Sequence, residues 1–337
     1  MPSSAPTIAG LAETALIDRI RRHLPPPPSW LRVGIGDDAA IVEPARNRLD
    51  VLSVDALVEG VHFDRRFTPP DAIGHRALAV NLSDLAAMGA QPRLALLSMA
   101  LPSALAVDDF DAIIAGFARL AAVYGVHLAG GNLTRSPGPL VVDVTVMGTV
   151  KPRRAITRAG ARPGDRLYVT GALGAGAAGL EMLRAGAPGT EGPAVRYLRP
   201  EPRVRMGLLL ARNRAPSAGM DLSDGLADGI RRLAAAGGVG VVIDAGALPI
   251  DPDARAWFER QGDDPVARSL SGGDDYELLI AVHPRRRGRL AAARKHGDTA
   301  ITEVGVCTAE LALVVRRTVD GRSWDMELPG PEFEHFG

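Results

Sequence analysis

The sequence contains little cysteine, few aromatic side chains and no excess of either charge. Its 337 residues include a single cysteine, Cys307, which excludes an internal disulfide framework and any zinc site built from several thiolates. Lys plus Arg and Asp plus Glu both number 39, so net charge gives no reason to expect a nucleic-acid or membrane-surface partner. Apolar runs stay shorter than the roughly 18 residues of a membrane span, and the N-terminus lacks a signal-peptide pattern. These absences predict a soluble, cytoplasmic protein.

Several common catalytic motifs are also missing from the sequence. It has no P-loop, no G-x-S-x-G elbow, no H-E-x-x-H pair and no protein-kinase signature. The stretch GALGAG at 171–176 has the wrong spacing for a dinucleotide-binding turn, and we interpret it as a packing turn. Cys307 lies in a strand-like run, which predicts a small buried residue and not a nucleophile. Any enzymatic activity must therefore depend on other residues.

The order of apolar segments predicts two α/β domains. At 46% hydrophobic and 23% charged residues the chain is typical of globular proteins, and its length favours two domains. A Pro-, Gly- and Arg-rich segment at 151–165 places the boundary near residue 151, which gives domains 1–150 and 151–337. Spacing and turn residues predict helices over 10–24, 70–89 and 107–125, and strands over 50–54, 93–101, 126–129 and 139–150. The strand at 126–129 is expected to run into a Gly-Gly turn at 130–131.

The second half repeats a strand, a Gly-rich turn and a helix at 166–183 and again at 218–238. A Gly-Gly-acid turn then precedes a strand within 269–282. The basic run at 283–290 is interpreted as a solvated loop and helix start.

Acidic residues recur in turns beside these apolar elements. The set comprises Asp37, Asp38, Asp55, Asp84, Asp221, Asp224, Asp274, Asp275 and Glu277. Each one alone is explained as a helix cap or turn residue. Together they suit Mg²⁺, which is usually held by a few carboxylates plus substrate phosphates. Asp84 falls late in its predicted helix, where capping needs no acid, so a ligand role is favoured more there than elsewhere.

Short motifs in register along nearly the whole chain resemble the thiamine-monophosphate kinase family, within the aminoimidazole ribonucleotide synthetase-like superfamily. They are GIGDDAAIV, SVDALVEGVHF, LAVNLSDLAAMGAQP, LAGGNLTR, ITRAGARPGDRLYVTG, LRPEPR, MDLSDGL, LSGGDDYEL and FEHF. The resemblance implies two α/β domains of that superfamily's type, with the N-terminal sheets pairing across a homodimer. It implies that 1–150 binds metal and ATP and dimerises, and that 151–337 completes the ATP and substrate sites. The implied reaction transfers the γ-phosphoryl group of ATP to thiamine monophosphate.

The same resemblance implies roles for individual residues. Several Mg²⁺ ions would be held by Asp38, Ser53, Val54 through its carbonyl, Asp55, Asp84, Asn132, Asp221 and Asp224. ATP would contact Gly131, Asn132, Arg158 and Ser223, and thiamine monophosphate would contact His62, Asp274 and Phe333. Arg158 and Asp224 would act in catalysis. The sequence departs from the family pattern at Asn132, where Asp is frequent, at Val54, where Thr is common, and at Phe333, where Trp or Tyr is common.

Phosphoryl transfer asks for positioned phosphates and charge neutralisation, and an acceptor phosphate needs no strong general base. Direct in-line transfer without a phospho-enzyme is therefore expected.

Three alternatives remain open. The chain could be another ATP-using enzyme of the superfamily, although selenophosphate synthetase needs a reactive Cys near its N-terminus and hydrogenase-maturation relatives end in a Cys-bearing tail. It could be a non-catalytic metal- or nucleotide-binding homologue. It could also be a structural protein, in which case the acids would lie far apart in space.

Overall fold

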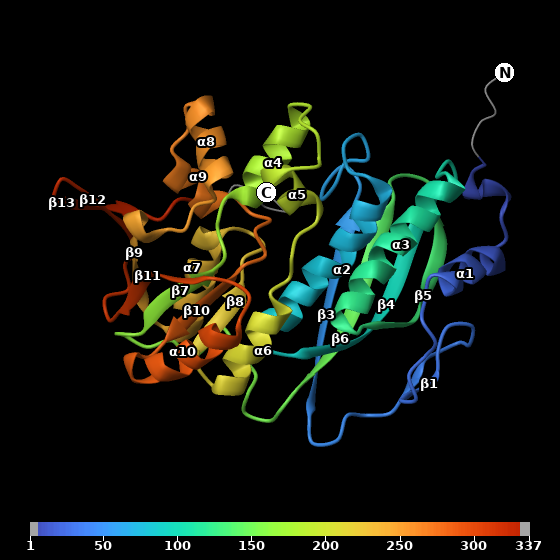
Figure 1. Ribbon diagram of the computed structural model, residues 1–337, viewed down its shortest axis with the longest axis horizontal. Helices are drawn as coiled ribbons and strands as arrows, with labels where there is room; N and C mark the ends of the chain where they lie inside the picture. Colours follow the sequence, from blue (N-terminus) through green and yellow to red (C-terminus); the bar gives the residue numbers. More distant parts are fainter. Residues whose placement is uncertain (1–5, 331–337) are drawn as a thin grey trace. The chain divides into compact units, whose positions relative to one another are not determined.

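The chain folds into two compact units (Figure 1). The computed structural model describes residues 6–330. The N-terminal unit extends up to Leu82 and resumes at Gln91–Lys151, and the C-terminal unit comprises Ser83–Ala90 and the chain from Pro152 onward. Each unit combines a β-sheet with helices, so the predicted α/β class is confirmed.

The N-terminal unit contains a four-stranded sheet in the order β3-β6-β4-β5, with only the β4–β5 pair parallel. Helices α2 and α3 lie over one face of this sheet (Figure 1). Side chains of β4 that point to this face, such as Leu97 and Met99, are buried. The bounds are β3 (Leu49–Val58), β4 (Gln91–Pro102), β5 (His127–Ser136), β6 (Val141–Val150), α2 (Pro70–Ala87) and α3 (Val107–Tyr124).

The two covering helices confirm the sequence prediction and pack closely for a local reason. Pro70 begins α2, and Gly125 ends α3 with a left-handed φ of 65°. A Cβ on Gly74 of α2 would lie 1.8 Å from the Ile113 carbonyl oxygen, and one on Gly116 of α3 would lie 1.9 Å from that of Asp71. Only glycine allows this approach of the two backbones.

Smaller elements complete the N-terminal unit. The predicted first helix is α1, and an ion pair between Arg19 and Asp111 joins it to α3. The proline run that follows α1 is not helical, as its composition indicates. These elements are η1 (Ile8–Gly10), α1 (Glu13–Arg22), β1 (Leu31–Val33) and β2 (Ile41–Val42).

The C-terminal unit contains a seven-stranded sheet in the order β13-β12-β9-β11-β7-β10-β8. Only the β12–β9 pair is parallel, and β8 lies at one edge. The strands are β7 (Arg166–Thr170), β8 (Ala218–Asp221), β9 (Gly240–Asp244), β10 (Leu278–Val282), β11 (Ile301–Thr308), β12 (Leu313–Val319) and β13 (Arg322–Glu327). The helices are α4 (Ala175–Arg184), α5 (Gly192–Leu198), α6 (Val204–Asn213), α7 (Leu226–Gly237), α8 (Pro252–Gln261), α9 (Pro265–Ser271), α10 (Arg287–His296), η2 (Ala245–Ala247) and η3 (Pro284–Arg286).

One sequence expectation is wrong: Gly130 and Gly131 do not form a turn. Strand β5 continues through both glycines to Ser136. A Cβ on Gly131 would lie 1.9 Å from the carbonyl oxygen of Leu97 on the neighbouring strand, so the glycine serves close strand pairing. Asn132 is therefore a strand residue.

Cys307 on β11 is buried, as predicted, and burial raises the pKa of its thiol to about 12, which suppresses the reactive thiolate.

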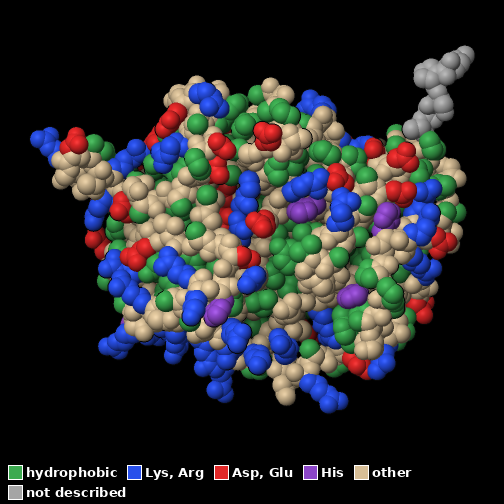
Figure 2. Space-filling view, in the orientation of Figure 1, with side chains coloured by type: hydrophobic (Ala, Val, Ile, Leu, Met, Phe, Trp, Pro, Cys, Tyr) green, Lys and Arg blue, Asp and Glu red, His purple; other side chains and the backbone are tan. Residues whose placement is uncertain are grey.

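Charged side chains of both signs are interspersed on the face drawn in Figure 2, with basic side chains gathered near α10. Arg285, Arg287 and Arg289 are exposed there, which confirms the solvated interpretation of the basic run. None of the helices formed by residues 6–330 has the length and apolar character that a membrane crossing requires.

Candidate active site

Two loops of the C-terminal unit bring four predicted site residues together. Strands β8 and β10 are antiparallel neighbours, with Asp221 opposite Leu278. Beyond the ends of these strands the two segments remain hydrogen-bonded to each other. The Leu222 N–H donates to the Glu277 carbonyl at 2.8 Å, and the Tyr276 N–H donates to the Leu222 carbonyl at 2.9 Å. We call residues 221–225 and 271–277 the paired loops; the predicted site residues they carry are Asp221, Ser223, Asp224 and Asp274.

A further backbone bond fixes the register of the paired loops. The Asp274 N–H donates to the Ser223 carbonyl at 2.7 Å. A predicted ATP contact and a predicted thiamine-phosphate contact are thus directly linked.

The paired loops hold residues in unfavourable backbone conformations. Asp274 has a φ of 68° and Tyr276 a φ of 51°, in the left-handed region that non-glycine residues seldom adopt. Gly225 has a φ of 91°, and a Cβ there would lie 2.9 Å from the Ser271 carbonyl oxygen. Such strain persists only where the surroundings enforce it, and it is typical of functional sites.

The carboxylate of Asp221, at the end of β8, is buried and accepts a hydrogen bond from a buried serine. Ser83 Oγ donates to Asp221 Oδ2 at 2.8 Å, and the exposed fraction of Asp221 is 5%. Ser83 belongs to the part of α2 that counts with the C-terminal unit, and the next residue, Asp84, is partly buried. The segment around Asp84 is thus in direct contact with the first residue of the paired loops, through the Ser83–Asp221 hydrogen bond.

Asp224 is exposed and lies just before Gly225, the N-cap of α7. No side chain caps this helix, so its first N–H groups and the positive end of its dipole are suited to a phosphate. Asp224 approaches Arg232 at 3.5 Å. The pKa of Arg232 is raised, first by its hydrogen bond to Asp228 and further by the charges of Asp228, Asp224 and Asp221, against the opposing effect of burial.

Arg158 lies beside β8 in an irregular segment and its side chain is exposed. The neighbouring residue Thr157 accepts a hydrogen bond from the Gly219 N–H at 2.9 Å, and the Ile156 N–H donates to Met88 at 3.2 Å. These bonds fix the backbone around Arg158 next to the strand that ends in Asp221.

Two other acids of the paired loops are structural anchors. Asp275 is buried and accepts from the N–H groups of Gly174 at 2.8 Å and Gly176 at 3.1 Å. These groups belong to the GALGAG turn at the start of α4, so this turn binds a side chain of its own chain. Glu277 is fully buried and accepts from Thr170 and from two arginines, Arg196 and Arg203.

Burial raises the pKa of Asp275 to about 7, although the two backbone N–H groups act in the opposite direction. The folded state therefore holds a proton that the unfolded state releases near pH 4. Stability from this group is complete below about pH 4 and is lost as the pH rises to about 7. We expect the unfolding free energy of the wild type, relative to Asp275→Asn, to fall by at most about 1.4 kcal/mol per pH unit in that window.

Urea titrations of both proteins at pH 5, 6, 7 and 8 measure this difference. Parallel stability curves would mean that Asp275 ionises normally.

In the N-terminal unit, β3 carries Ser53, Val54 and Asp55. Buried Asn81 of α2 binds the backbone of Asp55: its Oδ1 accepts from the Asp55 N–H at 3.1 Å, and its Nδ2 donates to Ala77 and, at 3.5 Å, to the Asp55 carbonyl. His62 Nδ1 accepts from the Val58 N–H at 3.0 Å, which places the proton of the neutral ring on Nε2.

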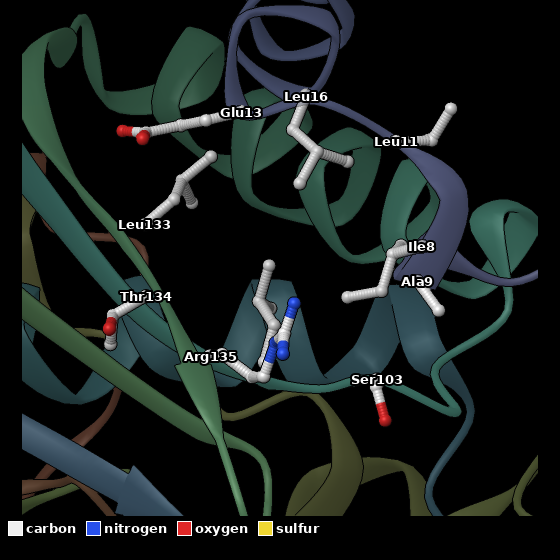
Figure 3. Close-up of a pocket in the computed structure, with 10 residues that line it drawn as sticks. Ile8, Ala9, Leu11, Glu13, Leu16, Ser103, Leu133, Thr134 and Arg135 are labelled. Carbon is white, nitrogen blue, oxygen red and sulfur yellow. The ribbon is translucent and has the colours of Figure 1, made fainter.

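Three predicted site residues of the N-terminal unit line one cavity beside β5, the edge strand opposite β3. Asp38, Gly131 and Asn132 border a space of about 490 Å³ whose remaining lining is mostly apolar. Glu13 at the start of α1 also borders it, and it borders a second cavity of about 200 Å³ as well. Figure 3 shows Arg135 among the apolar side chains of that second cavity, with the Glu13 carboxylate turned away from it. The first cavity is the one that contains predicted site residues.

The sheet keeps Asp55 apart from Asn132 within one chain. Asp55 is level with Val144, Leu97 and Gly131 across the strand order, so about 14 Å separates it from β5. Asn132 follows Gly131 on β5, so its side chain points to the opposite face of the sheet from the side chain of Asp55. Among residues 6–330, no three His, Cys, Asp or Glu side chains form an arrangement that could hold a metal ion. Phe333 lies outside the described residues.

Comparison with known proteins identifies the family of this chain. Two family models match: AIR synthase related protein, N-terminal domain, over residues 36–150, and AIR synthase related protein, C-terminal domain, over residues 162–317. A thiamine-monophosphate kinase of Synechococcus elongatus is 41% identical over 258 residues, which are 74% of this chain and 77% of that one. The crystal structure of thiamine-monophosphate kinase from Stenotrophomonas maltophilia K279a is 38% identical, covers 95% of this chain and 98% of its own, and has a TM-score of 0.81. The chain belongs to the thiamine-monophosphate kinase family.

A ligand-bound relative extends the comparison. The structure of AaThiL complexed with AMPPCP and TMP is 32% identical, covers 96% of this chain and 99% of its own, and has a TM-score of 0.73. The hydrogenase maturation protein HypE of Escherichia coli shares the fold with a TM-score of 0.75, but at 21% identity it indicates the fold alone.

Several motifs of the thiamine-monophosphate kinase family have a structural role that the sequence analysis missed. LRPEPR and LSGGDDYEL are joined because Arg203 donates to Glu277, and Gly171 leaves room for that carboxylate. Asn81 holds Asp55 and Ser83 holds Asp221, yet neither was selected. A polar residue inside an otherwise apolar helix was the available signal for both.

Proposed function

We propose that this protein transfers the γ-phosphoryl group of ATP to thiamine monophosphate, giving thiamine diphosphate and ADP. One observation carries the proposal: a relative 32% identical over nearly its whole length is complexed with AMPPCP and TMP. The paired loops support it, because they link a predicted nucleotide contact, Ser223, to a predicted acceptor contact, Asp274.

Mg²⁺ is part of the proposal, and the donor groups fit it. The predicted ligands offer carboxylate, amide, hydroxyl and carbonyl oxygens, which hard cations prefer. Mg²⁺ is usually held by one or two carboxylates together with substrate phosphates, so small groups of oxygens are sufficient. The ligands would be Asp38, Ser53, Val54, Asp55, Asp84, Asn132, Asp221 and Asp224. When bound, the ions neutralise phosphate charge and bring donor and acceptor together.

The remaining roles follow from the chemistry of each side chain. Arg158, exposed beside β8, offsets negative charge on the transferring phosphoryl group. The N-terminus of α7 behind Asp224 offers N–H groups to a phosphate. Gly131, Asn132 and Ser223 contact ATP, and His62, Asp274 and Phe333 contact thiamine monophosphate.

Transfer is direct and in line, with no phospho-enzyme. The acceptor is a phosphate oxygen that is largely ionised near neutral pH, so no strong general base is required. Positioning and charge neutralisation supply most of the rate enhancement in this reaction class.

A homodimer is also part of the proposal. Leu52 and Val54 on β3 are 67% and 58% exposed, and Leu96 of β4 is level with Val54 across β6 on the same face. Large apolar side chains on an open sheet face are typical of a surface that a second chain covers.

A product assay tests the proposed activity. With ATP and Mg²⁺, we expect thiamine diphosphate, detected as its fluorescent oxidation product, to accumulate from thiamine monophosphate and to disappear with EDTA. Unphosphorylated thiamine is the matched acceptor control and should give no product. ATP turnover with another acceptor but not with thiamine monophosphate would favour a different activity within the superfamily.

A further inference from the structure

The paired loops contain a side-chain hydrogen bond between two residues in left-handed conformations. The Tyr276 hydroxyl donates to Asp274 Oδ1 at 3.0 Å. Tyr276 is buried and has a φ of 51°. Asp274 lies two residues before it and has a φ of 68°. A tyrosine in this conformation is costly, which indicates that its position matters.

Both residues are fixed by the surrounding backbone. The N–H groups of Tyr276 and Asp274 donate to Leu222 and Ser223 in the opposite loop. Asp275 lies between them in the sequence, and its carboxylate accepts hydrogen bonds from the N–H groups of Gly174 and Gly176. The loop thus has little freedom, and the hydroxyl meets the carboxylate in a set direction.

We infer that Tyr276 is a positioning residue for Asp274 in recognition of the thiamine end of the acceptor. The inference rests on the proposed function. A carboxylate repels the acceptor's phosphate but attracts its cationic thiazolium ring and the amino group on its pyrimidine ring. A hydroxyl that donates to one carboxylate oxygen sets the direction in which the carboxylate accepts. Tyr276 therefore acts through Asp274 and needs no contact with substrate.

The test variant is Tyr276→Phe, which removes one oxygen and keeps the ring. We expect the KM for thiamine monophosphate to rise about tenfold, because a bond to a charged group is lost. The KM for ATP and kcat should stay within about twofold, since the phosphoryl-transfer geometry is untouched. A merely structural bond would change both KM values or the stability instead.

Tyr168→Phe is the matched control. Buried Tyr168 on β7 donates to Glu303 at 2.7 Å, so the variant also removes a tyrosine–carboxylate bond, but outside the paired loops. It should leave both KM values unchanged.

A double-mutant cycle completes the test. In an Asp274→Asn background, adding Tyr276→Phe should cause little further change in the KM for thiamine monophosphate, since the carboxylate it orients is gone. Equal changes in both KM values, no change, or a full additive effect would overturn the inference. So would a Tyr276→Phe protein that fails to fold while Tyr168→Phe folds. If the wild type forms no thiamine diphosphate, the proposed function fails; if only the selective KM effect is missing, the inference fails alone.

Discussion

Replacing Asp221 by asparagine is expected to lower kcat for thiamine diphosphate formation by roughly 10²–10³-fold. Asp221 is a buried carboxylate at the end of β8, beside Ser223 and Asp224 in the paired loops. Asparagine keeps an oxygen that can accept from Ser83 Oγ but removes the negative charge. The loss therefore reports on charge at the site and not on the hydrogen bond. Steady-state kinetics with saturating ATP and thiamine monophosphate measure it.

The control is Asp228→Asn. Asp228 lies in the first turn of α7 and forms an ion pair with Arg232, but it is not among the predicted ligands. This variant should keep kcat within a few-fold of the wild type. If raising Mg²⁺ partly restores Asp221→Asn, the residue acts through the metal. Unchanged kcat in Asp221→Asn would remove Asp221 from the site.

Replacing Glu277 by glutamine is expected to lower the free energy of unfolding by about 3–5 kcal/mol. Glu277 is fully buried, and its oxygens accept from Arg203 at 2.7 and 2.5 Å and from Arg196 at 3.0 Å. Burial lowers the pKa of Arg203, but its hydrogen bonds and ion pairs with Glu277 and Glu201 together raise it, so this guanidinium stays charged. A neutral partner leaves the exposed carboxylate of Glu201 as the remaining anionic partner of Arg203 and turns an amide N–H toward the buried guanidinium. Urea denaturation of both proteins measures the difference.

Asp325→Asn provides the comparison on the surface. Asp325 accepts from Arg316 at 2.8 and 2.9 Å, but both side chains are exposed. Solvent screening makes such a pair worth little, so no measurable change is expected. Equal stability losses in the two variants would mean that the buried ion pair has no special role.

Much of the fold follows from local patterns. Helix α3 has acids at its start, an apolar face at helical spacing and Gly125 at its end, and each feature acts locally. The strand and helix around MDLSDG are likewise set by a short apolar run and a glycine N-cap. Strand β5 was predicted too short because the role of Gly131 depends on Leu97, which lies far away in the sequence.

The candidate site was predictable as motifs but not as geometry. Asp274, Asp275 and Glu277 look alike in sequence, yet Asp275 binds backbone N–H groups and Glu277 binds arginines. Their partners are brought close only by the paired strands of the sheet. Spacing could not show that Asp55 and Asn132 lie on different edges of one sheet, since that depends on strand order.

The most direct measurement of the proposed activity follows the phosphoryl group itself. Incubate the protein with ATP labelled at the γ-phosphate, Mg²⁺ and thiamine monophosphate for less than one turnover, quench in acid, and separate protein, nucleotides and thiamine phosphates. The proposal predicts label in thiamine diphosphate, matched by an equal amount of ADP, and none on the protein. Label that reaches only inorganic phosphate, or that stays bound to the protein, would contradict direct transfer to thiamine monophosphate.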